Sequence, residues 1–290
     1  MKTSKGIILA GGSGSRLYPS TIAVNKQLLN LYDKPIIYYS ISVLMLAKIR
    51  DILIISSSEN LYLYKKLFGS GKNLGIKISY EIQEKPNGIA ESFLIGEKFI
   101  DRKKVALILG DNFFYGNNFS KNLIKASSNK NSTIFLFPSN FPENYGVATV
   151  KKNQILNIIE KPKKPKSNLA VTGLYFYDNK VVDYCKLLKP SKRGELEITD
   201  LNKIYIGKKK LNYINLGRGF NWFDTGTPET LLEASNFVHA IEKRQRFKIS
   251  CLEEISLNNN WLNKQKLKKN INKIKNCDYK NYIKKILIQK

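Results

Sequence analysis

The feature that most constrains this chain is a short apolar run near the N-terminus that ends in a cluster of glycines. The run is Ile7-Ile8-Leu9-Ala10, and Gly11-Gly12-Ser13-Gly14 follows it directly. An apolar, β-branched run of this length predicts a buried strand, and the glycines predict a tight turn whose backbone can approach a ligand closely. Backbone N–H groups in such a turn can form an anion-binding concavity. The stretch therefore indicates a strand that opens into a phosphate-binding loop.

Two cationic side chains follow the glycines. Arg16 offers a planar fork of donors that matches phosphoryl oxygens, and Lys26 adds a compact second charge. Two better-known glycine loops are excluded: no Gly-Lys-Ser/Thr follows, as a Walker A loop requires, and a dinucleotide fingerprint starting at Gly12 needs glycine where Leu17 stands. For the glycines alone, a turn that only reverses the chain is the alternative.

Strand-like segments alternate with helical patterns through the first part of the chain. The expected elements are a helix at about 35–47, a strand at 51–56, a helix at about 59–68, a strand at 76–82, a helix at about 89–100 and a strand at 105–109. This alternation predicts a Rossmann-like α/β fold, a mainly parallel central sheet between two layers of helices, with ligands outside the carboxyl ends of the strands. Because Gly11, Gln83 and Asp111 each follow such an end, we expect them to converge on one crevice.

The pattern changes at about residue 132. Shorter strands are expected at 133–138, 146–150, 155–159, 170–177 and 211–216, with helices beginning near 194 and at 228. We therefore expect one core over 1–242, made of a first part at about 1–131 that carries the glycine loop and an added part at about 132–227. Residues 243–290 hold fourteen Lys and Arg against three acidic residues, and their apolar residues recur at helical intervals. This segment is expected to be a helical appendage that serves as an interface or a regulatory surface.

The net charge of +26 over 290 residues raises nucleic acid or an anionic membrane as a partner. The lysines are scattered, however, and no arginine-rich arm is present, so neither partner is expected. The three cysteines, Cys185, Cys251 and Cys277, are far apart, which predicts reduced thiols in or near the core rather than disulfides or a zinc site. The first apolar run is too short for a signal peptide or a membrane span, and we expect a cytoplasmic protein.

Two aspartates are the candidate metal ligands. Asp111 follows a continuous apolar strand, and Asp224 follows Trp222-Phe223. Carboxylates at strand ends suit Mg²⁺, which binds through one or two carboxylates together with phosphate oxygens. Taken singly, an aspartate in such a place is more often a cap or a turn residue.

Several strings taken together resemble those of one enzyme family. Its loop reads G-G-x-G-[ST]-R-L, then P, then S-K-Q; here Arg16, Pro19 and Lys26-Gln27 match, and Asn25 replaces the serine. The further matches are the strings at 109–112, 173–178, 193–200 and 222–226. The chain therefore resembles the sugar-1-phosphate nucleotidylyltransferases, in particular the glucose-1-phosphate thymidylyltransferases, over almost its whole length.

The resemblance implies that 1–242 is a nucleotidyltransferase core, with a nucleotide-binding part at about 1–131 and a sugar-phosphate-binding part at about 132–227. It also implies a role for each matching residue. The nucleotide would be bound by Gly11, Gly12, Ser13, Gly14, Ser15, Arg16, Lys26, Gln27, Gln83, Gly88 and Asp111. The sugar phosphate would be bound by Tyr145, Gly146, Glu160, Lys161, Val171 and Arg193. The metal ligands would be Asp111 and Asp224, and the catalytic residues Arg16, Lys26, Asp111, Lys161 and Asp224. A regulatory site for the end product of the pathway would retain Tyr115, Gly116 and Arg218, although the histidines often found near 117–120 are missing.

The implied reaction is Mg²⁺-dependent transfer of a thymidylyl group from dTTP to glucose 1-phosphate, the first step of dTDP-rhamnose and deoxysugar synthesis, by a homotetramer. Gln83 can offer a donor and an acceptor to a pyrimidine edge, with backbone of Gly88 beside it. The family often has glutamine where Glu91 stands, so a UTP- or CTP-preferring enzyme is the alternative. A non-catalytic sugar-nucleotide sensor is another. His239 is expected to be structural, because a sugar phosphate is already ionised at neutral pH and needs no general base.

Overall fold

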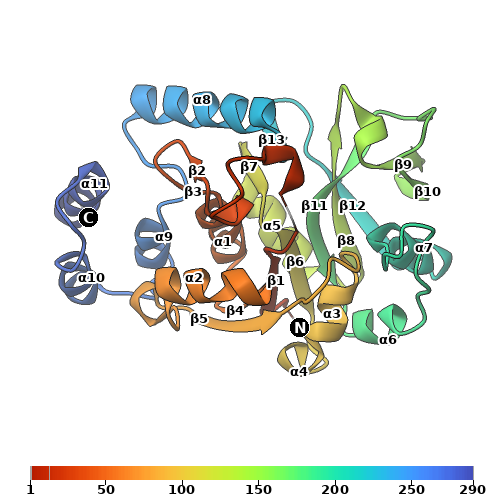
Figure 1. Cartoon of the computed structure of the whole chain (residues 1–290), viewed down its shortest axis with the longest axis horizontal. Coiled ribbons are helices and arrows are strands. Elements are labelled where there is room, and N and C mark those ends of the chain that lie inside the picture. The colour runs from red at the N-terminus through yellow and green to blue at the C-terminus, as the bar shows by residue number, and fades with distance from the viewer. Residues whose placement is uncertain (1, 13, 290) are drawn as a thin grey trace.

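Figure 1 shows the computed structural model, which describes residues 2–12 and 14–289. Within these residues, nine strands form the main sheet, and two further pairs of strands lie outside it. The strands of the main sheet are β1 (Lys5–Leu9), β4 (Asp51–Ser56), β5 (Lys77–Ile82), β6 (Val105–Leu109), β8 (Ser132–Pro138), β9 (Gly146–Lys151), β10 (Gln154–Glu160), β11 (Leu169–Tyr177) and β12 (Leu211–Asn215). The small pairs are β2 (Asn30–Leu31) with β3 (Lys34–Pro35), and β7 (Asn112–Gly116) with β13 (Phe220–Asp224).

The main sheet is parallel in its N-terminal part and mixed beyond it. Strands β5, β4, β1 and β6 lie side by side in parallel, so their carboxyl ends share one edge. Strand β11 then pairs antiparallel with β6, and with β8 and β9 further along its length. Strand β12 adds to β8 in parallel, and β10 closes the edge against β9. The expected α/β fold class is confirmed.

Helices cover both faces of this sheet. The helices of the described residues, not all of which contact the sheet, are α1 (Ile36–Leu46), α2 (Ser58–Phe68), α3 (Glu91–Ile95), α4 (Glu97–Ile100), α5 (Phe119–Ser128), α6 (Val181–Cys185), α7 (Ile198–Gly207), α8 (Pro228–Gln245), α9 (Leu252–Asn258), α10 (Lys264–Ile271) and α11 (Asp278–Gln289). Short 3-10 turns lie at Ser15–Leu17, Lys26–Leu28, Lys72–Leu74 and Pro142–Asn144.

The side-chain alternation of the strands divides the core between the two faces. On one face Ile8 of β1 and Ile108 of β6 share a core with Ile41 of α1. On the other face Ile7 of β1 lies in a core with Phe93 of α3. Because successive side chains of a strand point to opposite faces, a continuous apolar run is what a strand covered on both sides requires. The three-layer arrangement follows from that pattern.

The C-terminal helices lie to one side of the sheet. Helix α9 packs against α1, while α10 and α11 lie at the end of the molecule opposite to β9 and β10 (Figure 1). Among the described residues, no helix is both long and apolar enough to cross a membrane. Cys185 and Cys251 are buried as expected, but the prediction is wrong for Cys277, which is exposed just before α11.

The helix expected at 89–100 and the unexpected strand β7 are two differences from the prediction, and each has a physical reason. The single helix expected at 89–100 is divided into α3 and α4 at Gly96, which packs so closely on the sheet that a Cβ there would lie 3.1 Å from Ile7 Cδ1. Strand β7 was not expected, because its partner β13 follows it only after a long stretch of chain. The strands at 51–56 and 105–109 match their predicted bounds.

Candidate active site

The glycine loop follows β1 at the carboxyl edge of the sheet. Gly12 has a φ of 99° and Gly14 a φ of 60°, values that favour glycine. A Cβ on Gly14 would also come 2.8 Å from Thr21 Cγ2, so the loop is packed closely against the chain that follows it. Ser13 lies outside the described residues. Ser15 and Arg16 are exposed and begin the 3-10 turn after the loop.

Asn25, where the family has serine, caps the turn that presents Lys26 and Gln27. Its Oδ1 accepts hydrogen bonds from the Gln27 backbone N–H at 3.1 Å and from the Tyr64 hydroxyl at 2.7 Å. Asparagine and serine are both strong N-caps, so the departure preserves the local geometry. Gln27 Nε2 in turn donates to the Gly11 carbonyl at 3.2 Å, which ties this turn to the glycine loop.

A cavity of about 180 Å³ lies between these segments, at the ends of β1, β5 and β6. It is lined by Leu9, Gly11, Gly12, Gln27, Gln83, Pro86, Gly88, Ile89, Leu109, Asp111 and Glu195. The expected convergence of Gly11, Gln83 and Asp111 is therefore confirmed. Among the described residues, Gln27 Oε1 is one of three buried side-chain atoms without a hydrogen-bond partner. A ligand hydroxyl or N–H group in this cavity could satisfy it.

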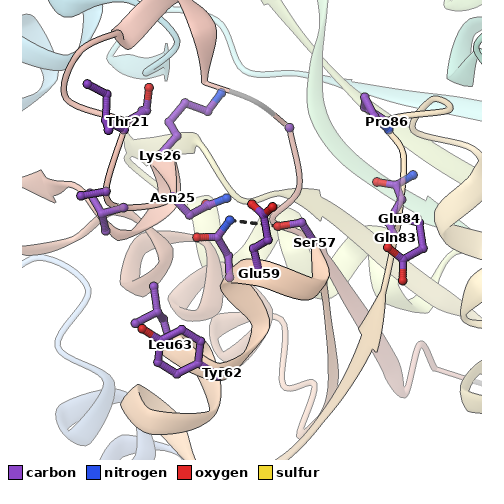
Figure 2. Close-up of a pocket in the computed structure, with 15 residues that line it drawn as sticks. Thr21, Asn25, Lys26, Ser57, Glu59, Tyr62, Leu63, Gln83, Glu84 and Pro86 are labelled. Atoms are coloured by element: carbon purple, nitrogen blue, oxygen red, sulfur yellow. Dashed lines mark hydrogen bonds between the residues drawn. The ribbon is translucent and has the colours of Figure 1, made fainter.

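A second cavity of about 540 Å³ adjoins the first and shares Gly12, Gln83 and Pro86 with it. Figure 2 shows Lys26 on one side of this space, with Gln83 and Glu84 on the other. The two cavities together extend from the end of β5 to the cationic turn after the glycine loop. A charged and extended ligand could occupy that length.

The two candidate aspartates are brought together by pairing of β7 with β13. Asp111 precedes Asn112, and Asn112 is the register partner of Asp224. Thr225, next along the chain, donates to the Asp111 carbonyl through its backbone N–H at 3.1 Å and through its hydroxyl at 2.8 Å. Arg16 and Asp224 both approach Gly226. If Gly226 carried a Cβ atom, that atom would lie 2.6 Å from Arg16 Nη2 and 3.1 Å from Asp224 Oδ1.

The pKa values of the two carboxylates are shifted in opposite directions. Burial disfavours the charged form of Asp111, but the charge and hydrogen bond of Lys26 outweigh it and lower the pKa of Asp111. Asn112 Nδ2 also donates to Asp111 Oδ1 at 3.0 Å. Burial, and then the neighbouring charge of Asp111, raise the pKa of Asp224 to about 6. A cation between the two groups would relieve this repulsion.

The donor set fits a divalent cation that is held only partly by protein. Among the described residues, no group of three or more His, Cys, Asp or Glu side chains could hold a metal. Two adjacent carboxylates leave the remaining coordination positions to phosphate oxygens and water, as hard cations at nucleotide sites require.

None of the six residues expected at the sugar phosphate lines either of these two cavities. Burial, and then the charge of Asp224, raise the pKa of Tyr145 to about 12. The Lys161 backbone N–H donates to the Tyr145 carbonyl at 3.0 Å, and the charge of Lys161 acts on Asp224. Val171 is buried in β11. The structure thus places Tyr145 and Lys161 next to the carboxylates.

Glu160, Gly146 and Arg193 form a separate polar group. Glu160 Oε2 accepts from the Thr199 hydroxyl at 2.5 Å, and a Cβ on Gly146 would lie 3.3 Å from the same oxygen. Arg193 Nη2 is 3.8 Å from Glu160 Oε1, but it binds both carboxylate oxygens of Glu197, at 2.9 and 2.8 Å. The hydrogen bond with Glu197 raises the pKa of Arg193 above its usual value.

A third cavity, of about 500 Å³, lies away from these residues, between β7 and the segment that leads into α9. Tyr115 and Gly116 line it, whereas Arg218 does not. Two of the three residues expected at a regulatory site thus share one cavity.

Comparison with known proteins identifies the family. The model of the nucleotidyl transferase family matches residues 5–241. The glucose-1-phosphate thymidylyltransferase of Neisseria meningitidis is 50% identical over 285 residues, which cover 98% of this chain and 99% of that protein. The chain belongs to the nucleotidyl transferase family, among its glucose-1-phosphate thymidylyltransferases. The thymidylyltransferase of Mycobacterium tuberculosis is 43% identical over 284 residues, covering 98% of this chain and 99% of that protein.

Solved structures agree with the assignment to the nucleotidyl transferases. A Bacillus anthracis structure, provisionally a glucose-1-phosphate thymidylyltransferase in complex with sucrose, has a TM-score of 0.75 at 40% identity and covers 81% of this chain and 95% of its own. A UDP-glucose pyrophosphorylase complexed with UDP-glucose shares the fold, with a TM-score of 0.73 at 24% identity, covering 82% of this chain and 99% of its own. Nucleotidyl transferases generally use a divalent metal, and the names of these relatives imply a nucleotide and a sugar phosphate as substrates.

Sequence reasoning missed three residues that support the aspartates. Asn112 Oδ1 accepts from Trp222 Nε1 at 2.6 Å and from the Gly173 backbone N–H at 3.1 Å, so it joins β7, β13 and β11 while donating to Asp111. Thr225 holds the Asp111 carbonyl. Gly226 leaves room for Arg16. All three residues follow Asp111 or Asp224 closely in the matching strings, and this position in the sequence could have identified them.

Proposed function

We propose that this nucleotidyl transferase moves a thymidylyl group from dTTP to glucose 1-phosphate and releases pyrophosphate and dTDP-glucose. The observation that carries the proposal is the convergence of the glycine loop, Lys26, Asp111 and Asp224 at one edge of the sheet. The relatives at 43–50% identity bear the name of this activity.

The proposed chemistry is an in-line displacement. A phosphate oxygen of glucose 1-phosphate attacks the α-phosphorus of dTTP; one P–O bond forms there, and the bond to the β-phosphate breaks. The attacking oxygen is already ionised at neutral pH, so no general base is required. His239, the only histidine in the chain, packs against Tyr32 with 5.1 Å between the two ring centroids, in keeping with a structural role. Positioning and electrostatic stabilisation would supply the acceleration.

Asp111 and Asp224 would hold Mg²⁺, which when bound neutralises charge on the phosphate oxygens. Arg16 and Lys26 carry fixed positive charge beside these carboxylates and would orient the triphosphate. The charge of Lys161 also acts on Asp224, and Lys161 would orient the phosphate of the sugar. Glu160 would accept hydrogen bonds from sugar hydroxyls, since a carboxylate has several acceptor sites and Thr199 fills one of them.

The test is pyrophosphate release with glucose 1-phosphate and each of four nucleoside triphosphates, with and without Mg²⁺. The Asp111→Asn and Lys161→Ala variants should each lose roughly a hundredfold or more in kcat, as the loss of a preorganised charge at a transition state does. Lys163→Ala, in the same exposed loop as Lys161, and Asp183→Asn, an exposed aspartate on α6, are the matched controls. Near-normal turnover of either active-site variant would refute these roles.

The same experiment distinguishes the proposed function from two alternatives. A uridylyl or cytidylyl transferase would release pyrophosphate fastest with UTP or CTP. A non-catalytic sugar-nucleotide sensor would bind nucleotide without turnover, but the combined retention of Arg16, Lys26, Asp111, Lys161 and Asp224 favours an enzyme.

Regulation and assembly are further proposals. The cavity beside Tyr115 and Gly116 would take the end product of the pathway, and residues 243–290 would serve as an interface within a cytoplasmic homotetramer. Inhibition by dTDP-rhamnose that is non-competitive with dTTP, and light-scattering mass determination of the purified protein, test the site and the assembly respectively.

A further inference from the structure

Helices α10 and α11 and the turn between them display lysines at one end of the molecule (Figure 1). Between residues 264 and 288 eight lysine side chains are exposed, and the one acidic residue in this range is Asp278. In the described part of the chain, none of these ammonium groups lies within ion-pair distance of a carboxylate or over an aromatic ring. The eight, called the lysine surface below, are Lys264, Lys266, Lys268, Lys269, Lys273, Lys275, Lys284 and Lys285.

The lysine surface is built on packed helices. Leu267 and Ile271 of α10 share a buried core with Ile283 of α11. Asn270 Nδ2 donates to the Asn73 carbonyl at 2.8 Å, which ties α10 to the turn before β5. Because the apolar side of each helix is buried in this way, the opposite side must face water. The positive charges are therefore held outward on a fixed support.

The outward side of α11 also carries an apolar side chain. Ile288 is 84% exposed. It follows Lys284 by four residues and Lys285 by three, so the three side chains are neighbours on the helix surface. At a membrane surface, such a side chain can enter the boundary between headgroups and acyl chains while the ammonium groups meet lipid phosphates. This arrangement favours an anionic bilayer as the partner.

A second copy of the chain does not suit the lysine surface. A two-fold interface places the same patch of both subunits face to face. Here it would bring lysine against lysine, with only Asp278 to compensate the repulsion. The interface of the proposed tetramer would therefore use other parts of 243–290.

A nucleic acid suits the lysine surface less well than a bilayer does. Proteins that bind nucleic acids use the planar fork of arginine and exposed aromatic rings on which bases stack. Residues 264–288 contain no arginine. Their two aromatic residues, Tyr279 and Tyr282, donate their hydroxyls to Glu253 and Glu254 of α9 at 2.6 and 2.7 Å and are thus turned inward. Exposed charge and one exposed apolar side chain are what remains.

We propose that the lysine surface is a peripheral docking site for a bilayer that contains anionic phospholipids. Each lysine near such a bilayer adds attraction, which acts over about one Debye length. The expectation of no membrane partner rested on lysines scattered along the sequence, whereas the fold gathers these eight on two adjoining helices and the turn between them. None of the eight lines the 180 Å³ or the 540 Å³ cavity, so docking and catalysis use separate residues.

The experiment measures co-sedimentation of the purified protein with phosphatidylcholine vesicles that contain or lack phosphatidylglycerol. Binding is expected only with phosphatidylglycerol, and it should be lost when salt is raised from about 0.1 M to about 0.5 M, because salt screens exposed charges. A variant that combines Lys268→Gln, Lys269→Gln and Lys284→Gln should bind roughly a hundredfold more weakly. Ile288→Ser, which leaves the charge unchanged, should weaken binding about fivefold.

The matched control combines Lys151→Gln, Lys163→Gln and Lys166→Gln, three exposed lysines at the end of β9 and in the loop after β10. It makes the same change in net charge at a different place and should bind vesicles as the wild type does. All substituted side chains are exposed, so circular dichroism should show the same fold in every variant.

Equal loss of binding in the two triple variants would show that net charge alone attracts the protein, and it would overturn the proposal. Retention on double-stranded DNA without binding to anionic vesicles would overturn it as well, in favour of a nucleic acid. Pyrophosphate release measured without vesicles should be the same in the wild type and in every variant. If the wild type released no pyrophosphate, the proposed function would fail, and the vesicle result would still decide the proposal for the lysine surface.

Discussion

At the scale of single residues, Asp224 occupies the least favourable electrostatic position in the site. Burial and the charge of Asp111 raise its pKa to about 6, against 3.8 for an unperturbed aspartate. The folded protein therefore binds more protons than the unfolded chain between about pH 4 and pH 6, and stability falls as the pH rises through that range. Above pH 6 the ionised Asp224 lowers the free energy of unfolding. The position of Asp224 in the site therefore makes the folded protein less stable.

The Asp224→Asn variant should consequently be more stable than wild type in metal-free buffer at pH 7.5, by about 2 kcal/mol. The difference should be much smaller near pH 4.5, where Asp224 is protonated in the folded protein, and it should vanish only below pH 3.8, where the unfolded chain is protonated as well. Urea unfolding in the presence of EDTA at the two pH values measures it. Activity should be lost in the same variant. A variant less stable than wild type at pH 7.5 would show that Asp224 is not electrostatically strained.

At the scale of elements, the loop between β5 and α3 depends on one glycine. Gly88 has a φ of 107°, and a Cβ there would come 2.4 Å from the Leu196 carbonyl oxygen. The loop is held by two backbone hydrogen bonds, from Leu196 N–H to the Asn87 carbonyl at 2.7 Å and from Ala90 N–H to the Leu196 carbonyl at 3.2 Å. It therefore docks on the segment before α7, and this contact places Gly88 and Ile89 in the lining of the 180 Å³ cavity.

Gly88→Ala should force this loop away from Leu196, at a cost of about 1–3 kcal/mol in backbone strain, and should raise the KM for the nucleotide at least tenfold. Steady-state kinetics with dTTP tests it, and circular dichroism should show an intact fold. Gly207→Ala is the control, because Gly207 ends α7 with an ordinary φ and open space around it. An unaltered KM in Gly88→Ala would separate the loop from nucleotide binding.

At the scale of the whole molecule, a buried ion cluster joins distant parts of the chain. Lys34 of β3 and Glu242 of α8 are 3.2 Å apart, with side chains only 3% and 4% exposed. Lys248 reaches Glu242 at 2.8 Å and Asp33 at 2.6 Å, and the Ile249 backbone N–H donates to Glu242 at 2.8 Å. The cluster thus connects the hairpin formed by β2 and β3, helix α8 and the segment between α8 and α9.

Glu242→Gln should destabilise the protein by about 3 kcal/mol, because it leaves the buried charge of Lys34 with less compensation while preserving the size of the side chain. Denaturant unfolding measures the change, and Glu233→Gln, an exposed position on the same helix, is the control. Equal stabilities of the two variants would mean that water or a neighbouring group compensates Lys34.

Local patterns were sufficient for much of the fold. The strands at 51–56 and 105–109 and the start of α8 at Pro228 follow from apolar runs and from the fixed φ of proline, which act over a few residues. Strand β7 escaped prediction because Asn112 and Trp222, which join it to β13, are 110 residues apart. The pairing that sets Asp111 beside Asp224 is therefore visible only once the chain is folded.

The layered sheet, the glycine loop at its carboxyl edge and the aspartates at strand ends could be predicted from the amino-acid sequence, because each depends on the periodicity and chemistry of neighbouring residues. The folded structure was needed to show that Asp224 is the carboxylate with the raised pKa and that the Gln83 amide nitrogen donates to Glu91. Those properties depend on Asp111 and Glu91, which reach their partners through the fold, and a pKa or an amide orientation is determined by the groups that surround it in space.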